Sequence, residues 1–185
     1  MISDILSTTE HKMEQTVEIS KEEFATIRTG RAHPSMFSKI TANYYGTSTP
    51  IQQLASFNVP EARTVIIAPY DQSALAAIER AIRDSDLGVN PSNDGHTIRL
   101  QLPVLTEERR KEYTKLARAK AEEGRIAIRN ARRHGVEACK RAEKDKEISE
   151  DELARAEKKL DEMTKKHVDE IDQLLKRKEA ELLEV

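Results

Sequence analysis

The sequence is poor in the residues that close a disulfide scaffold or cross a membrane. Its single cysteine, Cys139, cannot form an internal disulfide, and it contains no tryptophan. No apolar run is long enough to span a bilayer, and the first residues, Met1–Asp4, lack the basic start and apolar stretch of a signal peptide. These absences predict a cytoplasmic protein. Because 35% of the residues are charged, we expect long elements surrounded by solvent instead of one thick core.

Motifs for catalysis, metal binding and nucleotide binding are also missing. The chain has no GxxxxGK[ST] phosphate loop, no nucleophile elbow and no ordered triad. No two of the five histidines have the spacing of metal ligands. These histidines are His11, His33, His96, His134 and His167. We therefore expect neither an enzyme nor a bound metal or cofactor, and we interpret His167 as a histidine at the edge of a helical core.

Positive charge is concentrated in one segment. The whole chain has a formal net charge of −2, but residues 105–144 contain 13 Lys or Arg against 7 Asp or Glu, a net of +6, which leaves −8 for the remainder. A local basic surface on an acidic background favours one docking face over indiscriminate binding.

The same segment carries a row of arginines on a predicted helix. Arg118, Arg125, Arg129 and Arg132 are separated by 7, 4 and 3 residues, which places them within roughly 60° of one another at about 100° per residue. Lys111 and Lys115 extend the row, and Arg133 borders it. The side predicted to pack carries Tyr113, Leu116, Ala117, Ala127, Ala131 and Ala138.

A row of guanidiniums suits a ladder of phosphates, because each planar fork can hold two phosphate oxygens. The alternative is an ordinary solvated helix face, which acids at i±4 usually brace. Glu122 lies near the row, but no acid separates the arginines from Arg125 to Arg133. The pattern therefore predicts a polyanionic partner.

Three segments have the apolar spacing of long amphipathic helices, at about residues 3–28, 105–144 and 149–183. Thr106 is a predicted N-cap of the second helix, and Ser149 with Glu152 forms a predicted capping box for the third. No helix of this length buries its apolar stripe alone. We expect residues 1–30 and 105–185 to form an elongated antiparallel three-helix bundle.

The middle segment, residues 31–104, has a different character and contains all six prolines. Its patterns predict strands at 37–45, 64–68 and 96–102 and a helix at 73–84. We expect a small, β-rich α/β domain inserted into the bundle, an α+β fold overall. The chain leaves the bundle near Gly30 and Arg31 and returns near Pro103 and Val104, so these residues are a predicted two-strand hinge.

Several motifs, in order along the whole chain, resemble those of the ribosome recycling factor family. They are Ile27–Ala32, Tyr44–Thr47, Leu54–Ser56, Ser85–Gly88 with Asn90–Pro91, Leu105–Arg110, Arg129–Arg133 and Asp145–Asp151. The resemblance implies an L-shaped two-domain protein. It also implies action with elongation factor G and GTP on the post-termination ribosome, splitting the subunits so that mRNA and tRNA leave.

For the site, we expect the ribosome, through its large-subunit rRNA, to be the polyanion, and elongation factor G to be the second partner. We expect no DNA, no membrane and a monomer. The candidate rRNA-binding residues are Arg28, Arg110, Arg118, Arg125, Arg129, Arg132 and Arg133.

Two other functions compete with this reading. A coiled-coil adaptor or chaperone-like helical protein would expose apolar a and d positions and bind its target without salt dependence. A small nucleotide-binding enzyme built on the inserted module would need a glycine-rich phosphate loop, which the sequence lacks.

Overall fold

The computed structural model describes residues 1–184 and shows an α+β protein made of two compact units. The first unit comprises Met1–Phe24 and Lys115–Glu179, and the second comprises Ala25–Thr114 together with the described residues from Ala180 onward. Three long helices are present, α1 (Ile2–Ala25), α4 (Glu107–Lys144) and α5 (Glu150–Leu183). The units therefore divide the chain within α4 and α5, and the expected domain boundaries at 30/31 and 104/105 stay a prediction.

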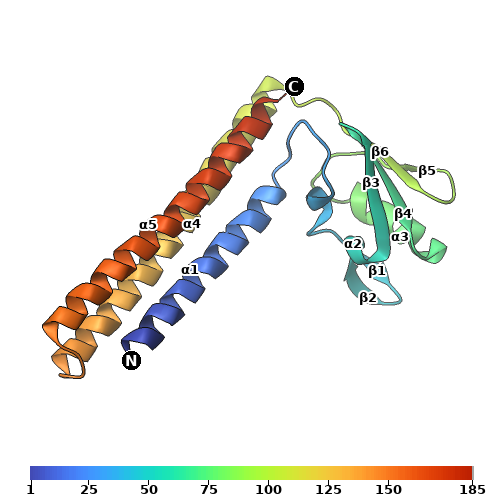
Figure 1. The fold of residues 1–185 in the computed structure, drawn as a ribbon. Helices are drawn as coiled ribbons and strands as arrows, with labels where there is room; N and C mark the ends of the chain where they lie inside the picture. The colour runs from blue at the N-terminus through green and yellow to red at the C-terminus, as the bar shows by residue number, and fades with distance from the viewer. Residues whose placement is uncertain (185) are drawn as a thin grey trace. The chain divides into compact units, whose positions relative to one another are not determined.

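The first unit is a bundle of the three helices, which lie side by side (Figure 1). A Cβ atom built on Gly135 of α4 would lie 2.8 Å from Thr9 Oγ1 of α1, and one on Gly124 would lie 2.8 Å from Ser20 Oγ. A residue near the start of α1 thus lies beside one late in α4, and a residue late in α1 lies beside one earlier in α4. These two helices are therefore antiparallel. The α4–α5 corner reverses the chain again, which makes α5 antiparallel to α4.

The packing side of α4 consists mainly of small residues and differs from the one predicted. Leu116 is 42% exposed and Ala127 is also exposed, so their assignment to the packing side was wrong. The buried residues are Ala117, Ala121, Gly124, Ile128, Ala131, Gly135, Cys139 and Ala142. Small side chains contribute little to an apolar pattern in the sequence. The predicted packing face was therefore drawn through the larger Leu116, which lies on the exposed side.

The predicted helix caps of α4 and α5 are confirmed. Thr106 Oγ1 accepts a hydrogen bond from the backbone N–H of Arg109 at 3.1 Å. Ser149 Oγ accepts one from the N–H of Glu152 at 3.1 Å, and the Glu152 carboxylate accepts one from the Ser149 N–H at 3.4 Å. The first helix ends at Ala25, three residues before the expected position.

The second unit contains an antiparallel sheet of order β3-β4-β6-β5 and a separate β1-β2 hairpin. In chain order its elements are a 3-10 turn (Pro34–Phe37), β1 (Thr41–Tyr44), β2 (Thr47–Pro50), α2 (Ile51–Leu54), β3 (Ala55–Glu61), β4 (Thr64–Pro69), a 3-10 turn (Gln72–Ala74), α3 (Leu75–Arg83), β5 (Ser92–Asn93) and β6 (Ile98–Gln101). One apolar core holds it together, with Phe37, Ile67 and Ile78 fully buried.

The strand that a short apolar run predicted at β4 is confirmed, and so are the strand that alternation predicted at β6 and the helix at α3. The strand expected from Phe37 begins only at Thr41. Residues 34–37 form a 3-10 turn instead, because the His33 ring accepts a hydrogen bond from the Ser35 N–H at 3.1 Å and Pro34 opens the turn. None of the helices among residues 1–184 is long and apolar enough to cross a membrane.

Candidate nucleic-acid interface

Three arginines of α4 face α5 and pair with its acids. They are spaced by seven residues, so they follow one seam between the two helices. The pairs are Arg118 with Glu179 at 3.1 Å, Arg125 with Asp172 at 2.7 Å and Arg132 with Asp161 at 2.7 Å. The predicted arginine row is therefore braced, but by acids 29 to 61 residues away, which local spacing did not reveal.

Arg125 is the most enclosed of the three. Its side chain is 20% exposed and also pairs with Glu122 at 3.0 Å. Burial acts to lower the pKa of Arg125, but hydrogen bonds to Asp172 and Glu122 outweigh it and raise the pKa. A guanidinium held on two sides has few donors left for an external phosphate, so Arg125 is mainly an internal brace.

A second set of cations on α4 points away from the bundle. Arg129 is 56% exposed, and its one ion pair among the described residues is a long 3.8 Å contact with Glu122. Arg133 is exposed and forms no ion pair within residues 1–184. Together with exposed Lys115 and Lys140, these residues lie within about 40° on the helix, and we call them the α4 outer face.

Arg132 belongs to the set that pairs with α5, but part of its guanidinium remains exposed. It is 43% exposed even though its Nε donates to Asp161 at 2.7 Å. A guanidinium has five N–H donors in a planar fork, so one edge can hold the carboxylate while the other remains available. Arg132 can thus offer N–H donors to an external phosphate while it stays paired with Asp161 of α5.

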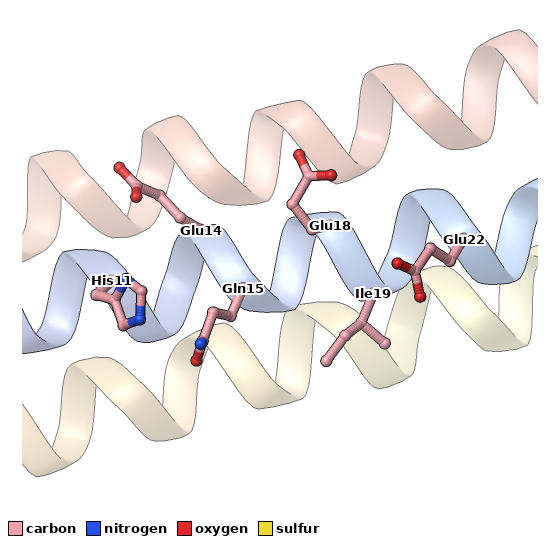
Figure 2. Close-up of a pocket in the computed structure, with 6 residues that line it drawn as sticks. All are labelled: His11, Glu14, Gln15, Glu18, Ile19 and Glu22. Carbon is pink, nitrogen blue, oxygen red and sulfur yellow. The ribbon is translucent and has the colours of Figure 1, made fainter.

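The outer side of α1 has the opposite charge. In Figure 2 a shallow hollow is lined entirely by side chains of this helix. The lining residues are His11, Glu14, Gln15, Glu18, Ile19 and Glu22. Helix α1 carries six acidic residues against two basic ones, so it repels a polyanion. Among the helices of the first unit, α4 has the largest surplus of basic residues, which makes it the most favourable for a phosphate backbone.

The two remaining predicted arginines belong to the second unit. Arg28 Nη2 donates to the carbonyl oxygen of Pro103 at 2.6 Å. The Nε atoms of Arg28 and Arg110 are buried and have no hydrogen-bond partner among the described residues. Arg28 thus ties together the two chain segments that enter and leave the inserted module.

The expected hinge residues also lie in the second unit, beside the end of α5. Arg31 Nε is 3.6 Å from Glu184 Oε2, and a Cβ atom on Gly30 would lie 3.1 Å from the Glu184 carbonyl oxygen. Val104 is 57% exposed. The antiparallel bundle expected from the sequence already brings the end of its third helix to this segment. The role of these residues as a hinge stays a prediction.

His167 and Cys139 are both internal residues of the first unit. His167 is 2% exposed, and its Nε2 lies 3.0 Å from Glu10 Oε1 of α1. Burial raises the pKa of the Cys139 thiol, with a smaller contribution from Glu157. The described residues include no group of His, Cys, Asp and Glu arranged to hold a metal ion.

Fold and surface together define a class of protein, a bundle of three long helices with a cationic outer face and a small β-sheet module. Known proteins of this class match the chain from end to end. The family model for ribosome recycling factor matches residues 20–183, and the chain belongs to the ribosome recycling factor family. Members of this family are translation factors and not enzymes.

The relatives and solved structures agree with this assignment. The ribosome-recycling factors of Cutibacterium acnes and of a Nocardioides strain are 64% and 61% identical, each over 100% of both chains. A solution structure of the ribosome recycling factor has a TM-score of 0.82 at 42% identity, covering 100% of this chain and 98% of that one. A T. thermophilus ribosome recycling factor, placed with E. coli elongation factor G on the E. coli post-termination complex, has a TM-score of 0.72 at 41% identity over 100% of both chains.

Proposed function

We propose that this protein acts in the cytoplasm as a monomer on the post-termination ribosome. With elongation factor G and GTP it promotes splitting of the subunits and release of mRNA and tRNA. The GTPase partner supplies the energy, and this chain needs no cofactor of its own. Support comes from the full-length similarity to ribosome recycling factors and from the relative placed with elongation factor G on a ribosome.

The observation that carries the proposal is the separation of the α4 cations into braces and an outer face. Arg129, Arg132 and Arg133 present guanidiniums that internal acids leave partly or wholly available. Such forks bind phosphate oxygens in pairs. We propose that these three contact large-subunit rRNA directly. The ion pairs of Arg118 and Arg125 hold this helix against α5. Arg28 and Arg110, in the second unit, are further candidates for contact with rRNA.

We predict that Arg129→Ala and Arg133→Ala each weaken binding to purified large subunits by about 1–2 kcal/mol, roughly five- to thirtyfold. Each variant removes one charged contact, so the log–log salt slope should also become shallower by about 0.7–0.9. Co-sedimentation over a series of salt concentrations measures both quantities.

The matched control is Arg155→Ala, which removes an exposed arginine of α5 in the same unit. It should leave both the affinity and the salt slope unchanged. Equal losses for Arg155→Ala and Arg133→Ala would mean that only total charge matters, and the assignment of the interface to α4 would be wrong.

We further propose that the segment holding Gly30 and Arg31 is the hinge, working with Pro103 and Val104. Glycine permits backbone rotations that other residues resist, so Gly30→Ala should reduce elongation factor G-dependent splitting. Ribosome binding should stay within about threefold of the parent, under 1 kcal/mol. Light scattering of post-termination ribosomes reports splitting.

Arg31→Ala is the control for the hinge, because it removes the contact with Glu184 and leaves glycine at position 30. If it slows splitting as much as Gly30→Ala does, the segment acts through its side chains and not through backbone rotation.

A further inference from the structure

The outer face of α1 carries carboxylates that the bundle leaves unpaired. Glu14, Glu18 and Glu22 recur every four residues, so they lie along one side of the helix. Among residues 1–184, Glu14 and Glu22 form no ion pair, and Glu18 pairs only with Lys21 of its own helix, at 3.2 Å. The negative charge of this face is therefore available to a partner outside the bundle.

The acids of α5 are used differently. Asp161, Asp172 and Glu179 are each held by an arginine of α4, so they contribute to the packing of two helices. Helix α1 instead meets α4 through the small polar side chains Thr9 and Ser20, which lie against two glycines. The outer carboxylates of α1 thus have no such part in the assembly of the bundle.

An apolar side chain lies among these carboxylates. Figure 2 shows Ile19 in the hollow beside Gln15 and Glu22, and Ile19 is 56% exposed. Lysine and arginine side chains combine an apolar stem with a charged head. Such a stem can lie along Ile19 while its head reaches the carboxylates, so the face matches basic side chains in shape as well as in charge.

Other kinds of occupant fit this face less well. A nucleic acid is repelled by its charge. The described residues include no group of His, Cys, Asp and Glu arranged to hold a metal ion. The hollow is lined by one helix only, whereas sites for small molecules are concave and enclose most of the ligand surface. A basic protein segment remains the best match.

We propose that the outer face of α1 docks a lysine- and arginine-rich segment of a protein component of the ribosome. This inference rests on the proposed function, which brings the chain to a particle made of RNA and protein. Protein segments that neutralise RNA phosphates carry Lys and Arg, so a ribosome offers such segments. The α4 outer face then binds RNA while α1 binds protein, and the two opposite charges together fix one orientation.

The first test measures the sign of a charge effect. The double variant Glu14→Gln with Glu22→Gln should bind intact ribosomes about three- to tenfold more weakly, because it loses two exposed ion pairs with the basic segment. The same variant should bind protein-free rRNA as tightly as the parent or more tightly, since it repels phosphates less. Co-sedimentation measures the first affinity and filter binding the second.

The matched control neutralises two exposed acids of α5 in the same unit, Glu162→Gln with Asp169→Asn. It should not weaken binding to intact ribosomes. If the α1 variant binds intact ribosomes as tightly as the parent, or if the α5 control is weakened equally, the docking surface on α1 is wrong. A parent chain that fails to bind ribosomes would instead remove the proposed function.

A second test identifies the chemical class of the partner. The full chain, with a photoreactive benzoylphenylalanine in place of Ile19, is irradiated on purified ribosomes. We expect an adduct that ribonuclease leaves intact and protease destroys, and no such adduct from the same group at Asp169. An adduct with rRNA, an adduct with a second copy of this chain, or no adduct at position 19 would overturn the inference.

Discussion

At the residue scale, two glycines within α4 set how closely the helices approach. A Cβ atom on Gly124 would lie 2.7 Å from Ile171 Cδ1 of α5 and 2.8 Å from Ser20 Oγ of α1, and one on Gly135 would lie 2.8 Å from Thr9 Oγ1. Glycine within a helix costs about 1 kcal/mol relative to alanine. Helix propensity therefore disfavours both positions, and close packing from two sides explains them.

We predict that Gly124→Ala lowers the free energy of unfolding by about 1 kcal/mol net. Overpacking costs about 1–3 kcal/mol, which exceeds the gain in helix propensity. Urea unfolding followed by the helical circular dichroism signal measures the change. Asn130→Ala, an exposed site on the same helix, should instead stabilise by a few tenths. A stabilising Gly124→Ala would show that Ile171 and Ser20 move aside at little cost.

At the element scale, α4 carries two sets of arginines on adjacent strips of its surface. One strip pairs with α5 through Arg118, Arg125 and Arg132, and the neighbouring strip exposes Arg129 and Arg133 to solvent. Helix α4 carries 13 basic against 7 acidic residues, whereas α5 carries 8 against 11. Opposite net charges thus favour the α4–α5 pairing and leave a surplus of positive charge on α4, which we propose serves an external polyanion.

We predict that the ion pairs along this seam contribute unequally. Arg125→Ala should destabilise by about 1–2 kcal/mol, since it removes a partly buried stem and a guanidinium that pairs with both Asp172 and Glu122. Arg118→Ala, at 66% exposure, should cost less than about 0.5 kcal/mol. A double-mutant cycle of Arg125 with Asp172 should yield a coupling of about 0.5–1 kcal/mol. Equal losses at the two arginines would contradict the role of burial.

At the scale of the whole molecule, the chain enters and leaves the inserted module at one place. Arg28 donates to the Pro103 carbonyl oxygen at 2.6 Å, so the two connecting segments are neighbours. The module has its own apolar core, built from residues 32 to 102. A module closed in this way is a candidate for removal without loss of the bundle.

We predict that replacing residues 31–104 with a short Gly/Ser bridge leaves a helical protein that unfolds cooperatively. Its melting temperature should fall, because the segments 25–30, 105–114 and 180–184 lose contacts that group them with the second unit. Thermal circular dichroism of the shortened chain beside the full chain measures this. A broad melt without a transition would show that the bundle requires the module.

Several features of the protein could be read from the sequence because they depend on neighbours within a few residues. The caps at Thr106 and Ser149, the alternation of Ile98, Leu100 and Leu102, and the length of α4 and α5 all follow from local hydrogen bonding and periodicity. The family motifs, which extend over the whole chain, identified the family for the same reason, since each motif is a short contiguous string.

Only the tertiary structure separated the arginines into braces and an outer face. Asp161, Asp172 and Glu179 lie 29 to 61 residues from their partners, and sequence spacing along one helix cannot reveal an acid on another. For the same reason the sequence did not reveal that small residues form the packing face of α4. The role of Gly124 and Gly135 depends on the close approach of α1 and α5. The sequence by itself determined the helices and their charge; the packing of the helices against one another decided which charges remain available to a partner.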